Sequence, residues 1–170
     1  MAEFWDILDG DRNFTGRVYE RKIGLNELDL PSGDYHVVVE VWTVCGGKVL
    51  LSQRHEDKHF PLMWECTGGS SVAGEESSVG AARELAEETG IVADPDKLVL
   101  LETVKRTMAF HDIYLYKVDL PFPQVVCQEG ETVDIRWCSP DEARAMIADG
   151  LLVKSVADMF ERHFDALFTD

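Results

Sequence analysis

Apolar residues along the chain follow two kinds of pattern, and the first kind predicts strands. Residues 36–45, HVVVEVWTVC, are rich in β-branched side chains and almost continuously apolar, which is typical of a buried strand. Gly46-Gly47 then favours a tight turn, so residues 48–53 are predicted to pair with this strand as a hairpin. Shorter apolar runs predict three further strands, at residues 98–107, 112–118 and 134–138.

The second kind of pattern predicts helices. Residues 77–89 begin at a serine pair and stop at Gly90, as a capped helix does. Residues 139–142, SPDE, combine an N-cap serine, a proline at the first helical position and a glutamate three residues on, and Gly150 is expected to end that helix. Residues 155–168 are predicted to form the last helix, because one mainly apolar stripe contains Val156, Met159, Phe160, His163, Phe164 and Leu167.

The order of these elements predicts an α+β fold, with a mixed β-sheet between helices in an α/β/α sandwich. The chain has 170 residues, of which 45% are hydrophobic, and this is enough for one well-buried domain. Residues 1–34 alternate short apolar runs with turn signals, so we expect an N-terminal extension with one or two short strands. Residues 35–170 are expected to form the main domain.

The net charge of −16 argues against binding to a nucleic-acid polymer, which would require a basic face. Small anionic substrates remain compatible with this charge if a metal and a few basic residues provide local positive charge. The N-terminus lacks the basic and apolar regions of a signal peptide, and the sequence contains no apolar run long enough to span a membrane. We therefore expect a cytoplasmic protein that does not bind membranes. The four cysteines lack CxxC spacing, which favours buried thiols over a zinc site or disulfides.

One face of the helix predicted at residues 77–89 carries three glutamates. Glu84, Glu87 and Glu88 stand at positions i, i+3 and i+4, so their like charges lie close together. A divalent cation would neutralise this face, because Mg²⁺ prefers oxygen ligands and leaves positions for phosphate oxygens. The neighbouring Gly68-Gly69 pair permits a tight turn and a close backbone approach. The pattern thus indicates a metal-dependent enzyme of phosphate chemistry.

The region from residue 69 to residue 91 also resembles a known signature, the Nudix box G-x5-E-x7-R-E-U-x-E-E-x-G-U. All fixed positions are present: Gly69, Glu75, Arg83, Glu84, Leu85, Glu87, Glu88, Gly90 and Ile91. The chain is therefore similar to MutT-like Nudix hydrolases, whose fold places the box as a loop-helix-loop. The resemblance implies Mg²⁺ or Mn²⁺ held by Glu84, Glu87, Glu88 and the Gly68 carbonyl. Arg83 stands with the catalytic set, and we expect it to pair with Glu75 or a neighbouring carboxylate in a structural role.

The box leaves the catalytic base and the substrate-binding residues open. Glu84 or Glu87 serves as the base in some relatives, and others use a later acidic residue. Candidates for that later residue are Asp112, which is included in the predicted catalytic set, and Glu129 and Glu131. For substrate phosphates, the basic candidates are Arg54, Lys58 and Lys105. A solvated loop or strand end remains the alternative for each of these residues.

The resemblance extends over nearly the whole chain to the isopentenyl-diphosphate-isomerase-like branch of the family. Cys66 stands two positions before Gly68, near the place of the isomerases' catalytic cysteine, but the complete R-E-x-x-E-E sequence favours hydrolysis. We therefore predict hydrolysis of a nucleoside diphosphate linked to another moiety, or of a similar diphosphate, by water attack at phosphorus. An isopentenyl-diphosphate isomerase and a non-catalytic module that binds a nucleotide metabolite remain the alternatives. A homodimer is possible, and the substrate itself is not determined.

Overall fold

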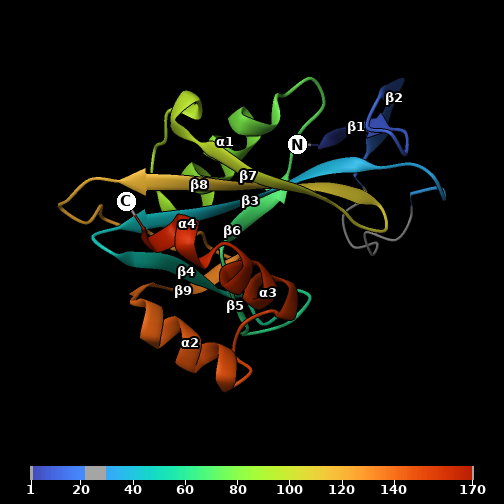
Figure 1. Ribbon diagram of the computed structural model, residues 1–170. Coiled ribbons are helices and arrows are strands. Elements are labelled where there is room, and N and C mark those ends of the chain that lie inside the picture. Colours follow the sequence, from blue (N-terminus) through green and yellow to red (C-terminus); the bar gives the residue numbers. More distant parts are fainter. Residues whose placement is uncertain (1, 22–29, 170) are drawn as a thin grey trace.

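The computed structural model describes residues 2–21 and 30–169, and its centre is a seven-stranded mixed sheet (Figure 1). The strands run in the order β5-β4-β3-β8-β7, with β6 paired to β3 and β9 paired to β4. Their bounds are β3 (His36–Cys45), β4 (Lys48–Arg54), β5 (Trp64–Glu65), β6 (Thr67–Ser70), β7 (Val99–Lys105), β8 (Ala109–Val118) and β9 (Thr132–Cys138). The predicted α+β fold with a mixed sheet is confirmed.

The strand at residues 36–45 is the centre of the sheet, as its apolar sequence predicted. It pairs with β8 in parallel along its whole length and with β6 antiparallel over residues 38–41. The predicted hairpin with β4 is present, and both turn glycines have positive φ, 52° and 73°. However, β3 and β4 pair at only two positions beside the turn, because β6 occupies that edge of β3 farther along.

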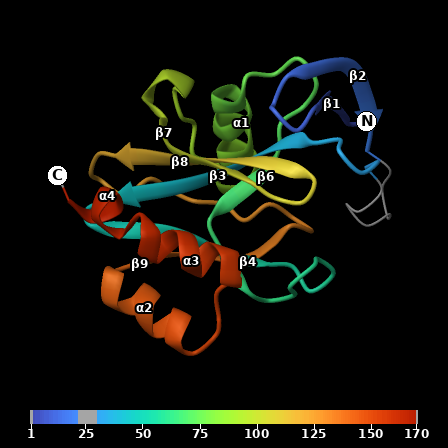
Figure 2. The same cartoon turned by 45° about the vertical axis from the view of Figure 1, so that its right-hand side comes forward.

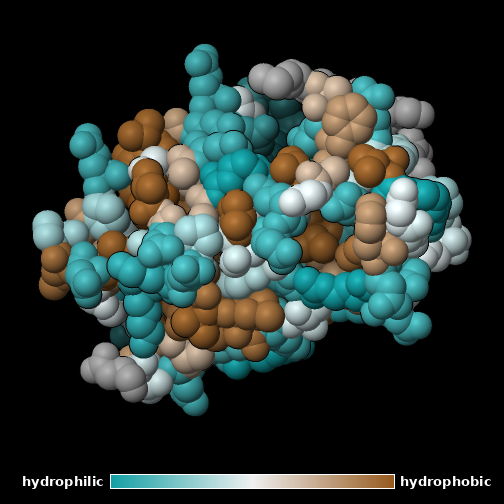
Figure 3. All heavy atoms as spheres, turned by 90° about the horizontal axis from the view of Figure 1, so that it is seen from above, coloured by the Kyte–Doolittle hydropathy of each residue, from teal (hydrophilic) through white to brown (hydrophobic). Residues whose placement is uncertain are grey.

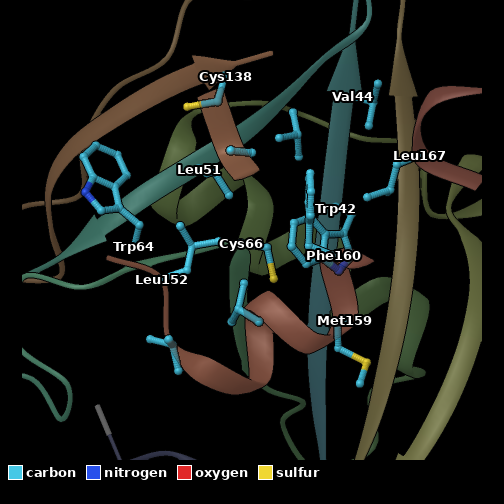
Figure 4. Close-up of a cluster of buried hydrophobic side chains, with 14 of the residues drawn as sticks. Trp42, Val44, Leu51, Trp64, Cys66, Cys138, Leu152, Met159, Phe160 and Leu167 are labelled. Carbon is cyan, nitrogen blue, oxygen red and sulfur yellow. The ribbon is translucent and has the colours of Figure 1, made fainter. Parts of the chain in front are cut away.

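Helices cover both faces of the sheet (Figure 2). Helix α1 (Ser77–Thr89) lies on one face, where Ala81 and Leu85 pack on Val39 and Val41. The other face is covered by helices from the C-terminal part of the chain, and Figure 4 shows its core, including Trp42, Cys66 and Phe160. Successive residues of β3 thus alternate between two cores, since strand side chains point to opposite faces.

The three predicted helices form, and the last differs from its prediction. Helix α2 (Pro140–Ala148) begins after the predicted capping box, in which Ser139 and Glu142 bond each other's backbone N–H groups. The helix predicted at residues 155–168 is instead two helices, α3 (Lys154–Arg162) and α4 (Phe164–Phe168), because His163 leaves helical geometry between them. The imidazole of His163 contacts Glu102 at 3.0 Å, and the turn brings Phe164 and Phe168 against Phe160.

The N-terminal residues form the two expected short strands, β1 (Phe4–Leu8) and β2 (Phe14–Glu20). Their hairpin packs against the main sheet, because Trp5 stacks on His36 with ring centroids 4.2 Å apart. It also contacts the loop before α1, where Asp6 accepts a 2.7 Å hydrogen bond from the Gly74 N–H. The boundary after residue 34 stays a prediction.

The face of the molecule seen from above is mixed in polarity (Figure 3). Figure 3 shows separate hydrophobic patches between hydrophilic side chains, and the exposed apolar residues of the N-terminal hairpin are Phe4, Phe14 and Val18. In the described part of the chain, no helix is long and apolar enough to cross a membrane.

Candidate active site

The helix that carries the three glutamates is fixed to the sheet through strand β6. This strand places Gly68 opposite Glu40 and Gly69 opposite Val39 of β3. Helix α1 then packs its apolar side, including the fully buried Leu85, on the same sheet and ends at Gly90, which has a φ of 77°. Because the apolar side faces the sheet, Glu84 is directed to the glycines of β6.

Gly69 and Glu84 fit together closely. A β-carbon on Gly69 would lie 2.3 Å from Cδ of Glu84, a separation that real side chains essentially never show. Burial raises the pKa of Glu84, and the neighbouring Arg83 opposes that shift. A glycine is therefore required at position 69 if the Glu84 carboxylate is to lie against the backbone of β6.

Arg83 connects the helix to the loop before it. Its guanidinium donates two 3.0 Å hydrogen bonds to Glu75, which confirms the predicted pair, and one to the carbonyl of Ser70. It also contacts Glu84 at 2.8 Å and Glu87 at 3.2 Å. These contacts are those of a residue that positions the loop and the glutamates.

Glu88 is the most unusual carboxylate of the cluster. The residue is 5% exposed, and its Oε2 atom is buried without a hydrogen-bond partner. Burial, and to a smaller degree the charge of Glu65, raises the pKa of Glu88 to about 8. A buried carboxylate oxygen without a partner lowers the stability of the fold. A bound ligand that contacts this oxygen would remove that cost, and no group of the protein does so.

The donor set fits a hard divalent cation. Glu84, Glu87 and Glu88 offer carboxylate oxygens, the ligand type that Mg²⁺ and Mn²⁺ prefer, and Glu88 has an oxygen free to bind. Among residues 2–21 and 30–169, however, no three His, Cys, Asp or Glu side chains are already arranged as a metal cage. Arg83 explains part of this absence, because it forms ion pairs with both Glu84 and Glu87, and a bound cation would have to replace these pairs.

Two of the predicted phosphate-binding residues lie near the glutamates. Arg54 pairs with Glu65 of β5 and donates a 2.6 Å hydrogen bond to the carbonyl of His59. Lys58 contacts Glu131 at 2.5 Å, and its charge acts to lower the pKa of Glu88. Lys58 and Glu65 thus lie close enough to Glu88 for their charges to affect its pKa, and Glu131 and Arg54 are the ion-pair partners of these two residues. Glu129 is exposed on the same loop.

Asp112 and Lys105 lie elsewhere. Strand β8 begins at Ala109, so Asp112 is inside the strand and not at its start as predicted, and its side chain is fully buried. It accepts hydrogen bonds from Arg12 at 2.7 and 2.5 Å and from Thr103 at 2.6 Å. Lys105 bonds the carbonyl of Gly10 and lies 4.6 Å from the ring centroid of Tyr35. Both residues therefore contact the N-terminal hairpin, and the structure does not bring them to the glutamates.

Burial acts to raise the pKa of Asp112, but the hydrogen bonds from Arg12 and Thr103 outweigh it and hold the pKa below its ordinary value. A carboxylate that stays ionised with both oxygens occupied is a poor base, because its lone pairs are already used. Its partners favour a structural role for Asp112 over the predicted catalytic one.

Cys66 does not have the surroundings of a catalytic cysteine. It is 3% exposed within the core shown in Figure 4, and burial raises the pKa of its thiol well above the ordinary value. The thiol form is poorly reactive, so this geometry gives no support to the isomerase alternative.

Sequence reasoning missed two glutamates: Glu65, whose charge acts on Glu88, and Glu40, which lies opposite Gly68. Glu65 follows a buried tryptophan and pairs with Arg54 across the β4 and β5 strands. Glu40 is the one charged residue within the apolar run at residues 36–45, and it faces Gly68 across the β3 and β6 pair. This charged residue within an apolar run could have been recognised from the sequence, because a charge in a buried strand lowers stability unless it is paired or functional.

Comparisons with known proteins agree with this geometry. The family model of the NUDIX domain matches residues 34–159. A Nudix hydrolase of Listeria monocytogenes is 28% identical over 151 residues, which cover 87% of this chain and 86% of that protein. The CTP pyrophosphohydrolase of Escherichia coli is 33% identical over 97 residues, which cover 57% of this chain and 70% of that enzyme.

A crystal structure of a protein from Deinococcus radiodurans has the same fold. Its TM-score is 0.70 at 20% sequence identity, with 94% of this chain and 98% of the other covered. At this identity the likeness concerns the fold alone. The predicted isomerase-like branch of the family stays a prediction.

Proposed function

The chain belongs to the NUDIX family of pyrophosphohydrolases, and from this premise we propose that it hydrolyses a nucleoside diphosphate linked to another moiety, or a similar diphosphate, with Mg²⁺. The oxygen of a water molecule forms a new bond to phosphorus, one bridging P–O bond of the anhydride breaks, and the two protons of water pass to the two phosphate products or to solvent. The observation that carries this proposal is Glu88, whose buried carboxylate oxygen has no partner in the protein. The name of the Escherichia coli relative, a CTP pyrophosphohydrolase, supports a nucleotide as part of the substrate.

Glu84, Glu87, Glu88 and the carbonyl of Gly68 would hold the cation, and Mn²⁺ would suit the same donors. When bound, the cation neutralises phosphate charge and makes water more acidic. Arg83 positions the loop and helix, and it remains paired with Glu75 when Glu84 and Glu87 are released. Arg54 can then leave Glu65, and Lys58 can leave Glu131, to bind phosphate oxygens of the substrate. A diphosphate carries more negative charge than a single carboxylate.

Of the three late acidic candidates, Glu131 is the best supported as the group that orients water. Its contact with Lys58 connects it to the glutamate cluster, since the charge of Lys58 acts on Glu88. Asp112 is held by Arg12, and Glu129 has no partner that directs it to the cluster among the contacts of the described residues. When phosphate replaces Glu131 as the partner of Lys58, this carboxylate is released beside the bound diphosphate.

The test is a substrate panel in the presence of Mg²⁺ or Mn²⁺. Nucleotide sugars, dinucleotides, nucleoside triphosphates and isopentenyl diphosphate are incubated with the protein in ¹⁸O-labelled water, and the products are identified by mass spectrometry. We expect ¹⁸O in one phosphate product and loss of activity with EDTA. Isomerised isopentenyl diphosphate without phosphate release would indicate the isomerase instead, and tight nucleotide binding without turnover would indicate the non-catalytic module.

A further inference from the structure

Glu40 is a buried carboxylate that the proposed metal site does not use. It lies in the middle of β3, between Val39 and Val41, on the sheet face opposite α1. Its side chain is 10% exposed, and its Oε2 atom is buried without a hydrogen-bond partner. An acceptor in this state lowers stability, so its presence at the centre of the sheet suggests a ligand.

The other oxygen of Glu40 is firmly held. Nδ1 of His111 lies 2.7 Å from Oε1, and Nη2 of Arg106 lies 3.2 Å from the same atom. Both partners come from the β7 and β8 side of the sheet, so the carboxylate is fixed from one direction. The side chain of Arg106 is 30% exposed and that of His111 is 15% exposed, which places this cluster at the edge of solvent.

Glu40 is also adjacent to the box. Gly68 is the partner of Glu40 across the β3 and β6 pair, and a β-carbon on Gly68 would lie 3.7 Å from Cγ of Glu40, so the glutamate side chain lies beside this glycine. Gly69, the next residue, contacts Glu84. Strand β6 therefore separates two carboxylates: Glu84 on the side of α1, and Glu40 on the opposite face.

The surroundings of Glu40 favour a neutral hydrogen-bond donor over a second cation. Arg106 already compensates the charge of the carboxylate, and its positive charge would oppose a dication at the same group. What is missing is a hydrogen-bond donor for Oε2, and a substrate N–H group would supply one. A glutamate is a natural acceptor for the amino group of a base such as cytosine.

We propose that Glu40, held by His111 and Arg106, is a substrate-binding residue that selects a nucleotide whose base carries an amino group. This inference rests on the proposed function, because it places the base of the substrate beside Gly68 while the diphosphate lies at the box glutamates. The chemical class is an amino-bearing nucleobase, such as cytosine or adenine, as opposed to uracil or hypoxanthine.

The test compares two matched pairs of nucleotides, CTP with UTP and ATP with ITP. Within each pair, a carbonyl oxygen replaces the amino group. We expect the wild-type protein to prefer the amino member of at least one pair by about 10-fold or more in kcat/KM. The Glu40→Gln variant places an amide where the free oxygen was, and we expect the ratio to fall to within about 3-fold of unity. Because the ratio is taken within one preparation, partial unfolding does not change it.

Glu102 provides a matched control. It pairs with Arg162 at 2.8 Å and with His163 at 3.0 Å, the same partner types as those of Glu40, but both its oxygens have partners and it lies on β7. The Glu102→Gln variant should keep the wild-type ratio. If Glu40→Gln does not fold, the Glu40→Asp variant withdraws the acceptor by one methylene and should also lower the ratio.

Several results would overturn the inference. Equal rates on both members of both pairs in the wild-type protein would do so, and so would an unchanged ratio in Glu40→Gln. An equal loss on all four nucleotides, with a higher Mg²⁺ requirement, would assign Glu40 to a metal instead. If the wild-type protein hydrolyses none of them, the proposed function fails on these substrates, and calorimetric binding of CMP against UMP and AMP against IMP then decides the inference separately.

Discussion

Two buried carboxylates at opposite ends of α1 show how differently such groups can be used. Asp112 lies near Ser77, the first residue of the helix, and Glu88 lies one residue before its end. Both are almost completely buried, but Asp112 has Arg12 and Thr103 as partners, whereas Glu88 has an oxygen without any. The pKa of Asp112 is lowered and that of Glu88 is raised to about 8. Burial therefore does not distinguish these two carboxylates, but the presence or absence of a hydrogen-bond partner does.

The largest effect that this comparison predicts is on turnover. Glu88→Gln removes a ligand charge, and we expect kcat/KM to fall by about 1,000-fold, since metal and transition-state charge stabilisation depend on it. The free energy of unfolding should stay equal or rise, because the variant removes a buried carboxyl group whose pKa is raised and whose Oε2 atom has no partner. Steady-state kinetics and denaturant unfolding measure the two quantities. Glu76→Gln, an exposed glutamate just before the same helix, is the control and should behave as wild type. Near-normal turnover of Glu88→Gln would remove it from the site.

Asp112→Asn is predicted to have the opposite effects: it should lower the free energy of unfolding and leave turnover nearly unchanged. It leaves Arg12, whose side chain is 35% exposed, without its carboxylate, and the loss of these charge-assisted hydrogen bonds should lower the free energy of unfolding by about 1.5–3 kcal/mol. The kcat of the folded protein should remain within about 3-fold of wild type, because the pair fixes the hairpin and does not contact the box glutamates. A 100-fold lower kcat with unchanged stability would restore the catalytic assignment of Asp112.

The free energy of unfolding should depend on pH through His36, which packs against the N-terminal hairpin and is not one of the box glutamates. Burial, with smaller effects from His111 and Arg21, lowers the pKa of His36 to about 4 from its ordinary 6.5. Between pH 4 and pH 6.5, His36 binds more protons in the unfolded chain than in the folded protein. Its neutral, buried form therefore contributes fully to the free energy of unfolding above pH 6.5, and this contribution is lost as the pH falls to about 4. We expect wild type to lose up to about 3 kcal/mol more than His36→Phe between pH 7 and pH 4. Phenylalanine keeps a ring against Trp5 and cannot be protonated. Parallel losses in both proteins would contradict this prediction.

The smallest effects should come from substitutions of Lys58 and Lys105, the two lysines that the sequence analysis predicted to bind substrate phosphates. Lys58→Met should raise KM by about 10-fold through loss of a phosphate contact. Lys105→Met should leave KM unchanged and cost less than about 1 kcal/mol of stability, because its ammonium lies over Tyr35. A higher KM in Lys105→Met would show that this lysine does reach the substrate.

Local patterns predicted what local interactions control. The helix at residues 77–89, the capping box at Ser139 and the glycine turn at residues 46–47 all form as expected. Errors occurred where distant segments meet: His163 divides the last helix, in contact with Glu102, and Asp112 is buried by Arg12, which lies 100 residues away in the sequence. Spacing along the chain carries no information about such partners.

The sequence by itself determined the family and the place of Glu84, Glu87 and Glu88 on one helical face, and it predicted metal binding, because these depend on periodicity and residue type within one segment. Only the tertiary structure decided which carboxylates have partners. It paired Asp112 with Arg12, left one oxygen free on Glu88 and on Glu40, and placed Glu40 against Gly68. The physical reason is that the state of a buried charge depends on the atoms that surround it in space, and these come from strands and loops far apart in the chain.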